Sequence, residues 1–344
     1  MADKDDYQQH IHVFRGVAII MIVCAHTYPS LNWSGSPELG RLIDTVVNQT
    51  SIFFFFIAGY LFQHLSDRFS YSRYLRQKAK TVVLPYLLLS IPALLVFTLM
   101  IKRVGMWWWF YDLPIWQQIG LFLLTGKHLA PLWFVPTITM FYLAAPLFLW
   151  IDRKWPQGYW LIVPLLALST YVGRGGQLGP LNFAMYLLPV YLLGMAFSHD
   201  KERALGLVQR WWPALVGLSV LCVVGEVYEW ASPPFRQMPF KASLTLLFTW
   251  LLWRHHRVFG KRLDYIAEVS FGIFFIHAYY ISAIKMLTVY VLEGRIYLGE
   301  GAEAIPGNVV NYLLYVGVVL TLTVATLWGA KALLGSRSRM FVGA

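Results

Sequence analysis

Long apolar runs with few polar interruptions follow one another along most of the chain. A helix needs about 20 mainly apolar residues to cross the hydrocarbon core of a bilayer. The pattern therefore predicts an all-α, polytopic membrane helical bundle of about ten transmembrane helices. The expected spans are residues 13–30, 46–63, 82–101, 131–150, 157–171, 181–198, 212–228, 239–253, 265–289 and 308–334. The run at 115–124 is too short to cross alone, and we expect an interfacial or re-entrant helix there, beside the aromatic cluster 107–111.

Composition excludes an ordinary soluble protein. Of the 344 residues, 58% are hydrophobic and only 13% are charged, whereas soluble domains average about 25% charged residues. The two cysteines, Cys24 and Cys222, both lie in apolar runs, which excludes a disulfide framework and a cysteine-built metal site. No metal-ligand spacing is found, so no metal is expected. With no repeat, linker or extramembrane domain in the pattern, we expect one domain over residues 1–344.

The charge distribution predicts the orientation in the membrane. A formal net charge of +11 could indicate a nucleic-acid partner, but in membrane proteins lysine and arginine collect on the cytoplasmic side. The basic loop 68–80 is therefore expected in the cytoplasm, which places both termini there and requires no nucleic acid. Residues 1–6 are polar and acidic, unlike a signal peptide, so the first apolar run should remain as a helix.

Ionisable residues at membrane depth are costly, and each is a functional hypothesis. Arg15 and His26 lie in the first span, and eleven residues of helix place them about 20° apart on one face and about 16 Å apart along the axis. A neutral imidazole is the commonest general base, and a sugar hydroxyl needs a base before it attacks an acyl carbonyl. The alternative is structural: Arg15 reaches the inner headgroups and His26 bonds a carbonyl of a neighbouring helix.

A second pair of polar residues lies in the ninth expected span. Ser270 and His277 are seven residues apart, so a helix brings them to nearly the same face, with His277 near mid-membrane. A helix-packing hydroxyl and a hydrogen-bonded structural histidine are the alternative reading. Trp133 follows Pro131 and is typical of an aromatic belt or of the lining of a cavity.

Several segments, in order and on the expected spans, resemble the acyltransferase 3 family, the integral-membrane acyltransferases that modify bacterial envelope and exported glycans. The segment from Phe14-Arg15 to His26 is similar to the family's opening arginine-to-histidine signature. The remaining similar segments are residues 53–60, 78–86, 132–135, 186–194 and 266–277. Some members carry an SGNH esterase-like domain, and we expect a member without one.

The resemblance implies an enzyme of the bacterial inner membrane, most simply an O-acetyltransferase. Acyl-CoA, with acetyl-CoA as the expected donor substrate, would bind from the cytoplasm, and no bound cofactor is expected. The acceptor would be a hydroxyl of an envelope, lipopolysaccharide or exopolysaccharide sugar, on a lipid-linked or polymeric glycan among the membrane lipids.

Roles for the candidate residues follow from the resemblance. His26 would be the base or, alternatively, an acyl carrier; His277 would be an alternative base or a relay, with Ser270 as its orienting group or an oxyanion donor. Donor contacts would come from Arg15, Lys78, Lys80 and Trp133, although positive-inside placement alone also explains the two lysines.

Two other classes of function remain open on the sequence. In a secondary transporter or lipid-linked-sugar flippase, the intramembrane histidine and arginine would line the permeation path. Such proteins commonly show inverted repeats and paired broken helices, and neither is seen in the sequence. A scaffold or sensor without chemistry would leave the face shared by Arg15 and His26 unexplained.

Overall fold

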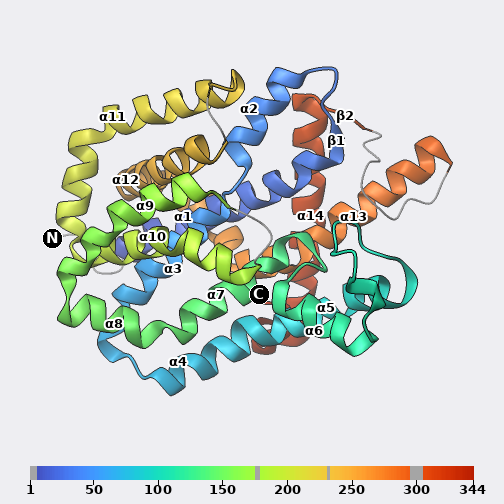
Figure 1. Cartoon of the computed structure of the whole chain (residues 1–344), viewed down its shortest axis with the longest axis horizontal. Helices are drawn as coiled ribbons and strands as arrows, with labels where there is room; N and C mark the ends of the chain where they lie inside the picture. Colours follow the sequence, from blue (N-terminus) through green and yellow to red (C-terminus); the bar gives the residue numbers. More distant parts are fainter. Residues whose placement is uncertain (1–5, 175–178, 231–232, 295–304) are drawn as a thin grey trace. The chain divides into compact units, whose positions relative to one another are not determined.

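The computed structural model describes residues 6–174, 179–230, 233–294 and 305–344, and these residues form helices almost throughout (Figure 1), as the apolar pattern predicts. The chain divides into two compact units. Unit 1 contains Met1–Met21, Arg41–Leu75 and Met140–Glu268. Unit 2 contains Ile22–Gly40, Arg76–Thr139 and Val269–Ala344.

Unit 1 is a helical bundle. Helix α1 (Asp6–Thr27) begins in unit 1 and ends in unit 2, and the short helices α2, α4 and α7 also pass from one unit to the other. Their bounds are Pro37–Val47 for α2, Tyr71–Lys78 for α4 and Phe134–Leu143 for α7. The helices within unit 1 are α3 (Ser51–His64), α8 (Ala145–Lys154), α9 (Ile162–Val172), α10 (Pro180–His199), α11 (Lys201–Val227) and α12 (Pro233–Glu268).

Helices α3 and α10 run parallel and cross at two glycines. A Cβ atom on Gly59 would lie 2.0 Å from the Tyr191 carbonyl oxygen, and one on Gly194 would lie 2.1 Å from the Phe56 carbonyl oxygen. The two backbones therefore approach more closely than any side chain would allow, as is common between membrane helices. The Gly59 contact places this close approach within the segment 53–60.

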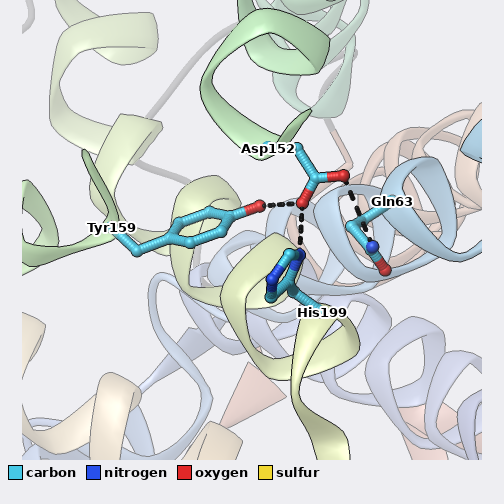
Figure 2. A network of polar contacts seen from close by, with 4 residues as sticks. All are labelled: Gln63, Asp152, Tyr159 and His199. Atoms are coloured by element: carbon cyan, nitrogen blue, oxygen red, sulfur yellow. Dashed lines mark hydrogen bonds and ion pairs between the residues drawn. The ribbon is translucent and has the colours of Figure 1, made fainter. Parts of the chain in front are cut away.

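One buried carboxylate joins four segments at the C-terminal end of α3 and α10 (Figure 2). Asp152, near the end of α8, accepts hydrogen bonds from the Tyr159 hydroxyl at 2.7 Å and from His199 Nδ1 at 2.8 Å. Gln63 Nε2 approaches its other oxygen at 3.5 Å. Buried carboxylates persist when donors surround them in this way. At the opposite end, the Tyr186 hydroxyl donates to Gln49 Oε1 at 2.6 Å, which fixes the parallel register.

Unit 2 contains α5 (Leu84–Leu95), α6 (Ile115–Thr125), α13 (Ser270–Glu293), α14 (Val309–Leu334) and α15 (Ser338–Phe341), with wide helical turns at Ala79–Val83 and Val96–Met100 that flank α5. Helices α13 and α14 pack together, and the Tyr315 hydroxyl donates to the Ile281 carbonyl at 3.1 Å. Two short strands, β1 (Leu31–Asn32) and β2 (Ile305–Pro306), pair in parallel.

A sharp bend separates α6 from the helical segment that follows it, at 71°. Gly126 ends α6 in the left-handed conformation, with φ of +69°, where a Cβ would lie 2.4 Å from the Trp133 backbone. Buried His128 holds the bend, because its Nδ1 bonds the Phe122 carbonyl at 3.1 Å and its Nε2 contacts Ser90 Oγ of α5 at 2.7 Å. The helix expected at 115–124 is confirmed as the first arm of this bend.

The described residues contain fewer clear spans than the sequence pattern predicts. Seven helical segments are long and apolar enough to cross a membrane, or eight if the bent pair is one span, against about ten expected. The expected span 131–150 is divided between α7 and α8. Two other expected spans, 157–171 and 239–253, are too short to cross a membrane alone. Helix α9 has only 11 residues, and the apolar part of α12 is limited by Lys241 and Arg254. The seven are Gln9–Ser30, Pro37–His64, Tyr71–Met100, Pro180–His199, Lys201–Val227, Ser270–Leu292 and Val309–Phe341.

Candidate functional site

Arg15 is anchored to the end of α12 within unit 1. Its Nε donates to the Ala267 carbonyl at 3.0 Å, in the last turn of α12. Gly16 packs beside this contact, since a Cβ there would lie 3.2 Å from the Leu263 carbonyl oxygen. A cation at a helix C-terminus satisfies carbonyls that the helix leaves without partners. Arg15 thus has a structural task that the sequence did not predict, and its guanidinium has further N–H groups for other partners.

His12 connects Arg15 to a carboxylate. Arg15 Nη2 lies 3.4 Å from His12 Nδ1, and His12 Nε2 lies 2.9 Å from Asp264 Oδ1. Because arginine only donates, His12 Nδ1 must accept, and the proton of a neutral ring then sits on Nε2 and faces the carboxylate. The sequence places His12 one turn from Arg15, but it gives no sign of Asp264, which lies on a helix more than 200 residues away.

His26 and His277 lie beside each other in unit 2. His26 occupies the last turn of α1 and His277 the second turn of α13, and their ring centroids are 5.4 Å apart with planes tilted by 39°. The two histidines that the sequence singles out separately are therefore neighbours. The His277 side chain is fully buried, whereas His26 is partly exposed.

Hydrogen bonding fixes the form of the His277 ring. Its Nδ1 lies 2.8 Å from the Ile273 carbonyl, which can only accept, so Nδ1 carries the proton. In the neutral ring Nε2 then holds a lone pair, and this buried atom has no hydrogen-bond partner among the described residues. A buried polar atom left without a partner costs about 1–3 kcal/mol. Such a cost marks Nε2 as a position with a role beyond packing.

Ser270, expected to orient His277, lies on the same helix. It is the first residue of α13 and is buried, but seven residues of helix separate it from His277 by about 10 Å along the axis. The Ile273 carbonyl holds the imidazole.

Aromatic rings extend from the histidine pair to the bent helix. Phe274 lies 6.4 Å from His277 and 5.2 Å from Phe134, between ring centroids, and Trp133 lies 6.3 Å from Phe134. These ring contacts connect Trp133 to His277 through Phe134 and Phe274. An aromatic wall of this kind lowers the local polarity around the imidazoles.

A second aromatic group follows His26 along the chain. Tyr28 stacks on Trp33 at 5.3 Å, and Trp33 meets the ring of Tyr312 edge-on at 5.9 Å. The Tyr312 hydroxyl donates to the Cys24 carbonyl at 2.9 Å, in the last turn of α1. Sequence reasoning missed Tyr312, because nothing in its local pattern distinguishes it from a membrane-facing tyrosine.

Lys78 and Lys80 lie at the junction of α4 and the wide turn Ala79–Val83. Lys78 is partly buried and Lys80 is exposed. The short helix α15, with Arg339, packs against the same turn. Both lysines and the histidine pair belong to unit 2.

The fold and these residues define a polytopic helical membrane protein with two neighbouring imidazoles, of which the fully buried one, His277, has a ring nitrogen without a hydrogen-bond partner among the described residues. A comparison with models of protein families matches residues 9–328 to the acyltransferase domain of the acyltransferase 3 family. The chain belongs to this family and is a multi-pass membrane acyltransferase that uses an acyl donor. Searches among curated proteins and among solved structures gave no match.

Proposed function

We propose that this protein transfers an acyl group, most simply acetyl, from cytoplasmic acyl-CoA to a hydroxyl of an envelope or exported glycan in the bacterial inner membrane. The observation that carries the proposal is the buried, unpaired Nε2 of His277 beside the ring of His26. A neutral imidazole of this kind can act as the general base that activates an alcohol for acyl transfer.

The proposed reaction assigns the base role to the histidine pair. His26 removes the proton of the acceptor hydroxyl, and His277, whose Nδ1 is already bonded to Ile273, relays or receives it at Nε2. The alkoxide oxygen attacks the thioester carbonyl, the carbon–sulfur bond breaks, and CoA leaves as a thiolate that takes the proton. Ser270 keeps the role of a proposed oxyanion donor to the tetrahedral intermediate.

The parallel register of α3 and α10 supports a crossing at 156–172, one of the ten crossings proposed from the sequence. Gln49 meets Tyr186 at one end, and Gln63 and His199 share Asp152 at the other. Two spans that run in the same direction must be separated along the chain by an odd number of crossings. With Tyr71–Met100 and the bent pair counted as two, the segment 156–172 supplies the third, although its helix α9 is short.

In this topology the donor would enter near Arg15. Eleven residues of α1 place Arg15 about 16 Å from the level of His26, roughly half of the hydrocarbon core. Arg15 would bind a CoA phosphate or the thioester region, and Lys78 and Lys80 would bind CoA phosphates by charge-assisted hydrogen bonds. Trp133 would line the path of the acyl arm.

Arg15→Lys should raise the KM for acetyl-CoA about tenfold, because a lysine cannot keep the Ala267 bond and also present a planar fork to the donor. The measurement is steady-state kinetics of the purified variant with varied acetyl-CoA. Arg153→Lys is the matched control, since Arg153 also donates to a backbone carbonyl, that of Ser66. An unchanged KM in Arg15→Lys would leave Arg15 with only its anchoring role on α12.

The proposed function predicts transfer between compartments. In sealed proteoliposomes, labelled acetyl-CoA added on the face that bears loop 68–80 should label a glycan acceptor present only on the other face. Thioester cleavage and acceptor labelling are measured together by scintillation counting and mass spectrometry. Liposomes without protein are the control. Labelling only when donor and acceptor share the inner face would contradict the two-sided mechanism, and no thioester consumption at all would contradict the acyl-CoA donor.

A further inference from the structure

A fully buried lysine lies in unit 1, far along the chain from the histidines. Lys241 of α12 is 0% exposed, and its Nζ donates to the Thr45 carbonyl at 2.9 Å and to the Val46 carbonyl at 2.6 Å. These are the last carbonyls of α2, so Lys241 caps that helix. The two bonds use two of its three N–H groups.

Two carboxylates surround this ammonium group. Asp44, one turn before the end of α2, and Glu226, near the end of α11, both interact electrostatically with Lys241. By formal charge, two carboxylates stand against one lysine in this cluster. A ligand that binds here is favoured if it donates hydrogen bonds and carries no negative charge of its own.

Two buried side-chain oxygens in the same region have no hydrogen-bond partner within the part of the chain that the structure describes. Gln237 lies four residues before Lys241, and so on the same face of α12, and its Oε1 has no hydrogen-bond partner at 4% exposure. Thr50, four residues after Val46, is 1% exposed, and its Oγ1 also has no partner. Each orphan costs folding free energy of about 1–3 kcal/mol. Both atoms can accept a hydrogen bond from a hydroxyl group.

Strained backbone and exposed aromatic rings flank these residues. Gln49 and Glu229 have φ of 56° and 55°, a backbone conformation that residues other than glycine and asparagine rarely adopt. Next to Glu229, the rings of Tyr228 and Trp230 stack at 6.1 Å and are 68% and 64% exposed. Exposed aromatic faces beside hydrogen-bonding groups fit the apolar face and the hydroxyl edge of a sugar ring.

We infer that Asp44, Thr50, Glu226, Gln237 and Lys241, here called the Lys241 cluster, form a binding subsite for a neutral sugar of the acceptor. The inference rests on the proposed glycan acceptor and specifies its class. Hydroxyl groups of the sugar donate to Gln237 Oε1 and to the carboxylates, and the ring packs on Tyr228 or Trp230. The excess of carboxylates discriminates against uronic acids and sugar phosphates.

The test measures sugar binding and folding stability on the purified full-length chain in lipid nanodiscs, without acyl-CoA. The probes are the methyl glycosides of glucose, galactose and mannose, and N-acetylglucosamine, with glucuronate as the charged comparison, followed by saturation-transfer NMR. Gln237→Met removes the orphan oxygen and keeps the side-chain length. Ser243→Ala is the matched control, because Ser243 is buried on the same helix and its Oγ already bonds the Pro239 carbonyl.

We expect at least one neutral sugar to bind the parent chain and glucuronate to bind more weakly. Gln237→Met should lower the affinity about fivefold, as expected for one lost hydrogen bond, and should raise the melting temperature, because an unpaired buried oxygen is removed. Ser243→Ala should leave sugar binding unchanged. If Gln237→Met does not fold, Thr50→Val takes its place, and it should also lower the sugar affinity and raise the melting temperature.

Two results would overturn the inference: no neutral sugar binds the parent chain, or Gln237→Met lowers the melting temperature and leaves binding intact. The same measurements distinguish failure of this inference from failure of the proposed acyl transfer. A chain that binds neutral sugars through Gln237 but never consumes acyl-CoA would refute the acyl transfer and keep the subsite. A chain that acylates its acceptor with the same acceptor KM after Gln237→Met would refute the subsite and keep the transfer.

Discussion

His26→Ala should lower the rate of acyl transfer by about 10²–10⁴-fold, the range that general base catalysis contributes. The variant should still insert and purify as a single species, because His26 is partly exposed and its removal opens no sealed core. The measurement is the initial rate of acceptor acylation at saturating acetyl-CoA, together with the melting temperature of the purified protein.

Cys24→Ala is the control for this experiment. Cys24 lies in the same turn of α1, and its backbone carbonyl, which accepts from the Tyr312 hydroxyl, is retained in alanine. Cys24→Ala should therefore keep most of the activity. A near-normal rate in His26→Ala at normal abundance would remove His26 from the mechanism. A large loss of melting temperature with a proportionate loss of activity would indicate a structural histidine.

His277→Asn should lower the transfer rate about 100-fold while preserving the fold of α13. The asparagine amide reaches the position of Nδ1 and can still donate to the Ile273 carbonyl, but it has no atom at the position of Nε2. The variant thus separates the structural bond of His277 from its unpaired nitrogen. Rates and melting temperature are measured as for His26, and kcat should fall more than the KM of either substrate rises.

The matched control is His256→Asn. The Nδ1 of His256 also bonds a backbone carbonyl of its own helix, that of Trp253, at 3.0 Å, but His256 lies on α12 in unit 1. The His256→Asn variant should retain full acyl-transfer activity. His277→Gln places an amide near Nε2 without a basic nitrogen, and it should be as inactive as His277→Asn if proton transfer is the role. Substantial activity in both variants would mean that Nε2 takes no part in the reaction.

The sequence predicted the helical class because long apolar runs must pair their backbone groups internally in a bilayer. It did not predict where those runs break. Helix α9 is shorter than a full span, and the run at 131–150 divides near Ala144, because packing among neighbours allows short and broken helices that an isolated span could not tolerate. Lys241 shows the same effect, since α2 carbonyls satisfy a charge that hydropathy alone would exclude.

The sequence likewise predicted only part of the candidate site. The sequence identified His26 and His277 separately, but not their approach, because 250 residues separate them and local periodicity carries no information on partners. It could not reveal that Arg15 is held by the end of α12, or that His12 and Asp264 continue that contact. Such pairings depend on which helix ends meet, and only the folded chain specifies that.

The glycine contact between α3 and α10 limits the motions available to the enzyme. Gly59 and Gly194 each receive a carbonyl of the opposite helix where a side chain would stand. Two helices interlocked in this way cannot slide by a turn without first separating, since the neighbouring positions carry bulky side chains such as Tyr60 and Tyr191. Shear between α3 and α10 is thereby blocked, so these two helices move as one rigid element in any opening that admits a substrate.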